Sequence, residues 1–138
     1  MWEFRHTETT AATPEQLWKR YADPPTWPEW DHKTESVTLD GPFAVGTTGK
    51  LKPVGGPKTK FRLLEVTDRR SFTDVSFLPL AKMHFSHKID PAAGGASITH
   101  TVKISGPLSP LFASVIGKKI AAELPRAMRR LGTLATEA

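Results

Sequence analysis

The sequence has no cysteine among its 138 residues. A disulfide framework, a thiolate metal site and a cysteine nucleophile are therefore excluded, and a reducing, cytoplasmic setting is expected. No apolar run approaches the ~18 residues that a membrane-spanning helix needs. The first residues, MWEFRHTETTAA, alternate like a strand and lack a basic segment followed by an apolar one, so no export signal is predicted either.

Nucleotide- and nucleic-acid-binding signatures are also missing. The stretch GPFAVGTTGK lacks the spacing of a phosphate-binding loop. Nineteen Lys and Arg against fourteen Asp and Glu give a formal charge of +5, but the basic residues are dispersed and no recognition motif accompanies them. We therefore predict no nucleic-acid partner and no cofactor. The basic residues near the C-terminus are best explained as a solvated helix face: Lys118, Lys119, Arg126, Arg129 and Arg130.

The first third of the chain predicts one strand and two short helices. The segment EFRHTETT alternates with period two, which is typical of a strand. Thr13 and Gln16 form a capping box around Pro14, so a helix begins there. Asp23 precedes two prolines that end this helix, and only a short second helical turn can include TWPEWD.

The rest of the chain predicts six antiparallel strands between residues 33 and 104, followed by one long helix. Turn-forming segments separate the strands. Two strands each place one histidine on an otherwise apolar face: Met83, Phe85, His87 and Ile89 in the first, and Ile98, His100, Val102 and Ile104 in the second. The final segment, from SPLF onward, is amphipathic, and Pro125 is expected to bend it near its middle.

This order of elements fits a single domain, residues 1–138, in which a sheet curls around a long helix. On the motifs TPEQLWKRYADPPTWPEWD, GPFAVGTTGKL, RLLEVTDRRSFT, GGASITHTVKISGPL and AAELPRAMRRL, the chain resembles the START-like (SRPBCC) helix-grip superfamily, in particular its bacterial polyketide cyclase/dehydrase and lipid-transport group. The resemblance implies an α+β helix-grip fold. It has a curved, antiparallel, seven-stranded sheet wrapped around the C-terminal helix, and two short helices after the first strand.

The resemblance also implies a cavity between sheet and helix that binds a small hydrophobic or amphipathic ligand: a lipid, a polyketide-like compound or an aromatic compound. The residues expected to contact such a ligand are Trp27, Trp30, Met83, Phe85, His87, His100, Val102, Phe112, Ile116, Ile120 and Leu124. Two alternatives stay open. The protein would be a cyclase/dehydrase-type enzyme that uses cavity histidines, or an interaction module without a ligand whose basic helix face docks an acidic partner.

For several single residues, the sequence leaves more than one role open. Trp27 and Trp30 either wall the cavity, with an indole N–H free for a partner, or are plain core. His87 and His100 are candidate catalytic residues, ligand contacts, or satisfied core histidines.

Other polar groups are candidates for the same wall. His6 and Glu8 would join the two histidines there, which raises a zinc site without a recognisable ligand spacing; no metal site is predicted. Tyr21 is expected in the core with its hydroxyl at the rim. Asp74 has no assignable direction, and if buried it would need a partner such as Arg62. The 53–58 turn is either an ordinary hairpin or a mobile gate.

Overall fold

The computed structural model describes residues 1–137 and begins with the three predicted elements. They are β1 (Trp2–Thr10), α1 (Pro14–Tyr21) and the 3-10 helix η1 (Pro24–Glu29). Both halves of the capping box form: the Gln16 amide donates to the Thr13 hydroxyl at 3.2 Å, and the Thr13 amide donates to the Gln16 side chain at 2.9 Å. Proline at the first positions of η1 keeps it separate from α1.

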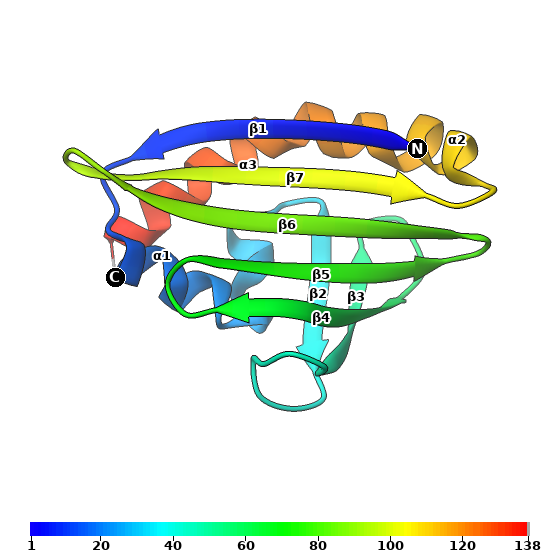
Figure 1. Cartoon of the computed structure of the whole chain (residues 1–138), viewed down its shortest axis with the longest axis horizontal. Helices are drawn as coiled ribbons and strands as arrows, with labels where there is room; N and C mark the ends of the chain where they lie inside the picture. Colours follow the sequence, from blue (N-terminus) through cyan, green and yellow to red (C-terminus); the bar gives the residue numbers. More distant parts are fainter. Residues whose placement is uncertain (138) are drawn as a thin grey trace.

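Six further strands complete one antiparallel sheet of seven strands (Figure 1). They are β2 (Thr34–Leu39), β3 (Thr48–Pro53), β4 (Thr59–Thr67), β5 (Ser71–Leu78), β6 (Ala81–Ala92) and β7 (Gly95–Ser105). The order across the sheet is β1-β7-β6-β5-β4-β3-β2, so β1 lies beside the last strand. The turn between β3 and β4 has Gly55 at a φ of 77°, a conformation that glycine adopts without strain.

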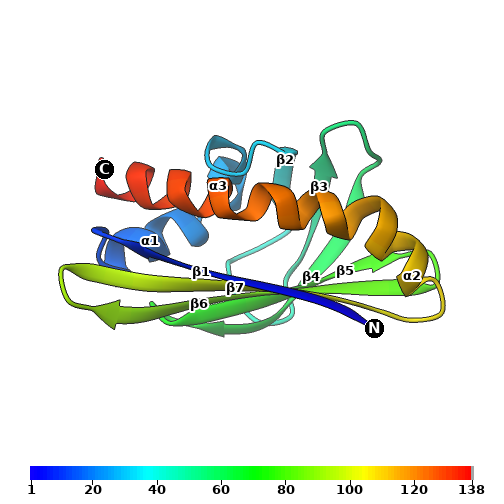
Figure 2. The same ribbon diagram turned by 90° about the horizontal axis from the view of Figure 1, so that it is seen from above.

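The C-terminal helix has three consecutive parts: α2 (Ser109–Phe112), the π-helical segment η2 (Ala113–Gly117) and α3 (Lys118–Thr136). Pro125 lies inside α3 without ending it, and η2 is a separate irregular segment; the bend expected at Pro125 stays a prediction. Figure 2 shows this helix crossing one face of the sheet. Two glycines permit the close approach to β1, because a Cβ on Gly117 would meet the Trp2 ring at 3.0 Å and one on Gly132 would meet Thr10 at 2.5 Å.

The helix-grip architecture predicted from the sequence is thus confirmed, and no helix of residues 1–137 is long and apolar enough to cross a membrane. The sheet face toward the helix, here called the concave face, carries the core. Near α1 and η1 this face is filled by fully buried side chains that include Tyr21, Phe72 and Ile98. Its other half, toward α2, combines buried side chains, Val102 and Ile104, with apolar side chains that are only partly buried, such as Met83.

Gly49 lies on β3, between β2 and β4, and its close contacts make the packing of this part of the sheet testable. A Cβ on Gly49 would lie 2.3 Å from the Thr38 carbonyl oxygen and 2.8 Å from the Phe61 ring. Because a backbone atom cannot yield, we expect Gly49→Ala to lower the free energy of unfolding by about 1 to 3 kcal/mol in urea denaturation. Gly41→Ala is the control, since its Cβ would meet Thr47 at an ordinary 3.6 Å. Equal stability of the two variants would contradict this packing.

Candidate functional site

A row of four rings crosses the concave face where α1 and η1 cover it. The strand register aligns His6 on β1 with His100 on β7, His100 with His87 on β6, and His87 with Phe72 on β5. The predicted pairing of His87 with His100, and the addition of His6, are therefore confirmed. His87 and His100 are buried, whereas His6 is partly exposed.

Aromatic side chains enclose the two buried histidines. The His87 ring stacks on Phe72 at a centroid distance of 3.9 Å and on Phe85 at 4.6 Å. Tyr21, from α1, comes within hydrogen-bonding distance of His100, with 2.6 Å between its hydroxyl and Nε2. We call this group the aromatic cluster: Tyr21, Trp27, Trp30, Phe72, Phe85, His87 and His100. Tyr21 is fully buried, so its hydroxyl lies inside the cluster and not at a rim.

The two tryptophans from η1 and its end are core residues, 6% and 4% exposed. The Trp27 indole N–H donates to the Tyr21 carbonyl oxygen at 3.0 Å. The Trp30 indole nitrogen and the His100 Nδ1 have no hydrogen-bond partner among residues 1–137. Buried polar atoms usually have partners, so these two enclosed atoms are exceptions within the packed cluster.

Burial keeps both histidines neutral. It lowers the pKa of His100 to about 3, and neighbouring His6 acts in the same direction. Burial also lowers the pKa of His87 well below its ordinary value, although Nδ1–H donates to the Phe72 carbonyl oxygen at 3.3 Å. An imidazole that stays neutral across physiological pH is a poor proton donor, so the cluster is better suited to hydrogen bonding than to general acid catalysis.

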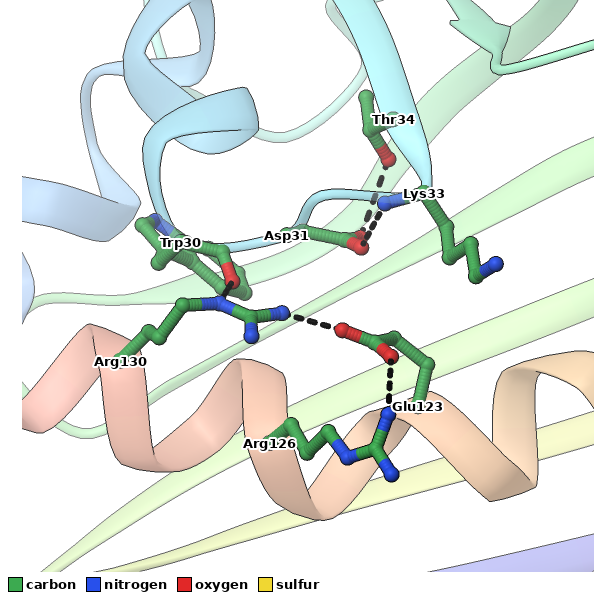
Figure 3. Close-up of polar contacts among 7 residues, drawn as sticks. All are labelled: Trp30, Asp31, Lys33, Thr34, Glu123, Arg126 and Arg130. Carbon is green, nitrogen blue, oxygen red and sulfur yellow. Dashed lines mark hydrogen bonds and ion pairs between the residues drawn. The ribbon is translucent and has the colours of Figure 1, made fainter.

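Polar contacts fix η1 against the C-terminal helix (Figure 3). Arg130 donates from Nε to the Trp30 carbonyl oxygen at 3.0 Å and from Nη2 to Glu123, which lowers the pKa of the Glu123 carboxyl. Asp31 accepts from the Thr34 hydroxyl at 3.0 Å, yet burial raises its pKa. Arg130 is therefore a structural clamp on the Trp30 end of the cluster, while Arg126 and Arg129 are exposed as predicted.

The zinc alternative finds no support in this geometry. His6 bonds through Nε2 to Glu8, which also accepts from Arg129 at 3.4 Å. Within residues 1–137 no three histidine, aspartate or glutamate side chains are grouped so that they could hold a metal ion.

The second half of the concave face is less tightly closed. Met83 and Phe85 on the sheet are partly exposed, as are three helix residues that the sequence placed opposite them: Phe112, Ile116 and Ile120. Val102 and Leu124, also expected at the site, are buried. We call this part the open half. Two hollows that the described residues form lie elsewhere, one around Phe77 and Pro107 and one around Thr9 and Gly132. An enclosed cavity therefore stays a prediction.

Asp74 belongs to the open half, and sequence reasoning left it unassigned. It pairs with Leu63 on β4 and Phe85 on β6, so its side chain shares their concave face, while Arg62 pairs with Val75 and is exposed. Asp74 is 8% exposed, and burial raises its pKa to about 8. The alternation in SFTDVSF gave no direction because both faces carry apolar residues. The register between β5 and β6, in which Phe72 aligns with His87, would have shown that Asp74 shares the face of His87.

Comparison with known proteins follows this geometry. Residues 1–136 match the family described as polyketide cyclase/dehydrase and lipid transport. The chain belongs to this family. An uncharacterised protein of Mycobacterium tuberculosis is 32% identical over 115 residues, covering 78% of this chain and 69% of the relative. The family and the fold are consistent with a domain that binds a hydrophobic ligand.

Solved structures share the fold at low sequence identity. A protein from Mesorhizobium loti superposes with a TM-score of 0.78 at 15% identity, covering 99% of this chain and 98% of the other. Norcoclaurine synthase from Thalictrum flavum, solved with dopamine and hydroxybenzaldehyde, superposes with a TM-score of 0.72 at 17% identity, covering 99% and 87%. These similarities establish the architecture of this family member and leave its ligand to be argued from its own residues.

The Tyr21–His100 hydrogen bond can be measured by a double-mutant cycle. Tyr21→Phe and His100→Phe each leave one buried polar atom unpaired, so each is expected to lower the free energy of unfolding by about 1 to 3 kcal/mol. The double variant leaves neither atom unpaired and should be more stable than the sum of the two losses implies. Additive losses in urea denaturation would contradict a hydrogen bond between these groups.

The raised pKa of Asp74 leads to a second prediction, which concerns the pH dependence of stability. Its folded pKa of about 8 lies above the ordinary 3.8, so the folded state keeps a proton that the unfolded chain releases. This contribution to stability is complete below pH 4 and is lost as pH rises toward 8. Asp74→Asn should therefore be more stable than the wild type at pH 8, by roughly 3 to 5 kcal/mol, and nearly equal to it at pH 4. A difference that stays constant from pH 4 to pH 8 would refute the raised pKa.

Proposed function

We propose that this protein binds a small hydrophobic or amphipathic molecule in the open half of the concave face, between the sheet and the C-terminal helix. The observation that supports this most directly is the uneven closure of that face. The half near α1 and η1 buries Tyr21, Phe72 and His100 completely. The half toward α2 leaves large apolar side chains partly exposed on both the sheet and the helix, namely Met83, Phe85, Phe112, Ile116 and Ile120.

Apolar side chains that face one another without full burial favour an apolar occupant. Covering them removes hydrocarbon surface from water, which stabilises a complex by about 25 cal/mol for each Å². The rigid aromatic cluster at one end supports this proposal, because a preformed wall reduces the ordering cost of binding. Val102 and Leu124 are buried and belong to the packed core beside this surface.

The histidines support the ligand in a secondary way. His87 and His100 position the rings of Phe72, Phe85 and Tyr21, which form the wall at the closed end of the proposed site. General acid catalysis by these histidines would need a protonated imidazole at neutral pH, which their lowered pKa values disfavour, and the same low basicity makes them weak general bases. We therefore favour binding over the enzyme alternative.

Filling the open half tests the proposal. Ile116→Trp is expected to occupy the space and to weaken binding of an environment-sensitive apolar dye by at least about tenfold, measured by fluorescence titration. Val115→Trp is the matched control, since Val115 is 51% exposed and lies outside the open half. Thermal unfolding of both variants checks that the fold persists. Equal dye binding by wild type and Ile116→Trp would place the binding site elsewhere.

A further inference from the structure

One buried carboxyl in the open half is not explained by packing. On the concave face of β5, Asp74 lies between Phe72, which belongs to the aromatic cluster, and Ser76. The register places it between Leu63 on one side and Phe85 on the other. A charged or strongly polar group among such neighbours costs free energy unless something binds to it.

The described part of the chain supplies no such partner. Among residues 1–137 no hydrogen bond or ion pair reaches the Asp74 carboxyl, and its raised pKa has burial as its cause. Among residues 1–137, the unpaired side-chain polar atoms that are completely enclosed are Trp30 Nε1 and His100 Nδ1, and the Asp74 oxygens do not belong to this group. Asp74 as a whole is 8% exposed, and we take this remaining surface to include the carboxyl oxygens.

Ser76 gives this position a second polar group. It is 6% exposed and aligns with Phe61 on β4 and Met83 on β6, so it lies on the same face. Concave-face neighbours on one strand are two residues apart, which is roughly 7 Å along the strand. The two side chains thus form a short polar stripe within the apolar surface of the open half.

We propose that Asp74, with Ser76 beside it, is the anchor for a neutral oxygen group of the ligand, a hydroxyl or a carbonyl. This inference rests on the binding function proposed above and narrows it: the occupant is amphipathic, with its polar end held deep on β5 and its apolar body against Phe85 and the helix.

Chemistry favours a neutral oxygen over a cation. A protonated carboxyl donates through its O–H and accepts through its C=O, so it can satisfy both hydrogen-bonding functions of an alcohol or donate to a carbonyl. The raised pKa of Asp74 is consistent with a carboxyl that holds its proton at neutral pH. An ammonium group would have to lose its hydration and remove that proton, and a buried ion pair seldom repays such a cost.

The test uses three molecules of one shape: 2-methylnaphthalene, 2-naphthalenemethanol and 2-naphthalenemethylamine. Dissociation constants at pH 7 come from displacement of the apolar dye. In the wild type the alcohol should bind at least as tightly as the methyl compound, and the amine more weakly than the alcohol. In Asp74→Leu the alcohol should lose about tenfold or more relative to the methyl compound, because its hydroxyl then has no partner. Asp74→Asn should preserve the wild-type ratio within about threefold, since an amide can also donate and accept.

Controls separate the two levels of the proposal. Asp90→Asn removes an exposed carboxyl on β6 and should leave every ratio unchanged. If 2-methylnaphthalene does not bind the wild type at all, the proposed function fails. If it binds, but the ratio of alcohol to methyl compound is the same in the wild type and Asp74→Leu, the function stands and the anchor is wrong. If the wild type binds the amine more tightly than the alcohol, and Asp74→Asn loses this preference, then Asp74 binds a cation and the proposed neutral oxygen group is wrong.

Discussion

The hydrogen bond between Tyr21 and His100 is the contact on which the division of the concave face depends. It joins α1 to β7 across the interior, and 2.6 Å between the two atoms leaves no room for a ligand at that point. Trp27 bonds to the Tyr21 carbonyl oxygen and Arg130 to that of Trp30, so η1 is held from both sides. With this end fixed, the remaining surface of the sheet is the part that can receive a small molecule.

Electrostatics follow the same division. In the half near α1 and η1, burial keeps the imidazoles neutral, and Glu123 and Arg130 pair with each other beside Trp30. In the open half, Asp74 is a polar group without a partner among residues 1–137. Proteins retain such groups at a cost in stability, and that cost is typical of functional sites.

Much of the fold could be predicted because its signals are local. The capping box at Thr13, the prolines after Asp23 and the period-two faces of β6 and β7 depend only on neighbouring residues, and each is confirmed. The face containing Asp74 could not be read in this way, because Phe72 and Val75 lie on opposite faces of β5 and both are buried. The π-helical segment and the contact of Arg130 with Trp30 depend on packing between distant elements, which no local pattern encodes.

The roles assigned to the tryptophans and histidines divide on a similar line. Their position on the concave face was predictable from spacing, whereas the degree of enclosure depends on where α1 and η1 lie.

The central claim is that a small molecule occupies the open half. A crystal structure of the protein with 2-naphthalenemethanol tests it most directly: the account predicts the naphthalene between Phe85 and Ile116, with its hydroxyl at Asp74. Naphthalene bound only in a surface hollow, such as the one around Phe77 and Pro107, would contradict it.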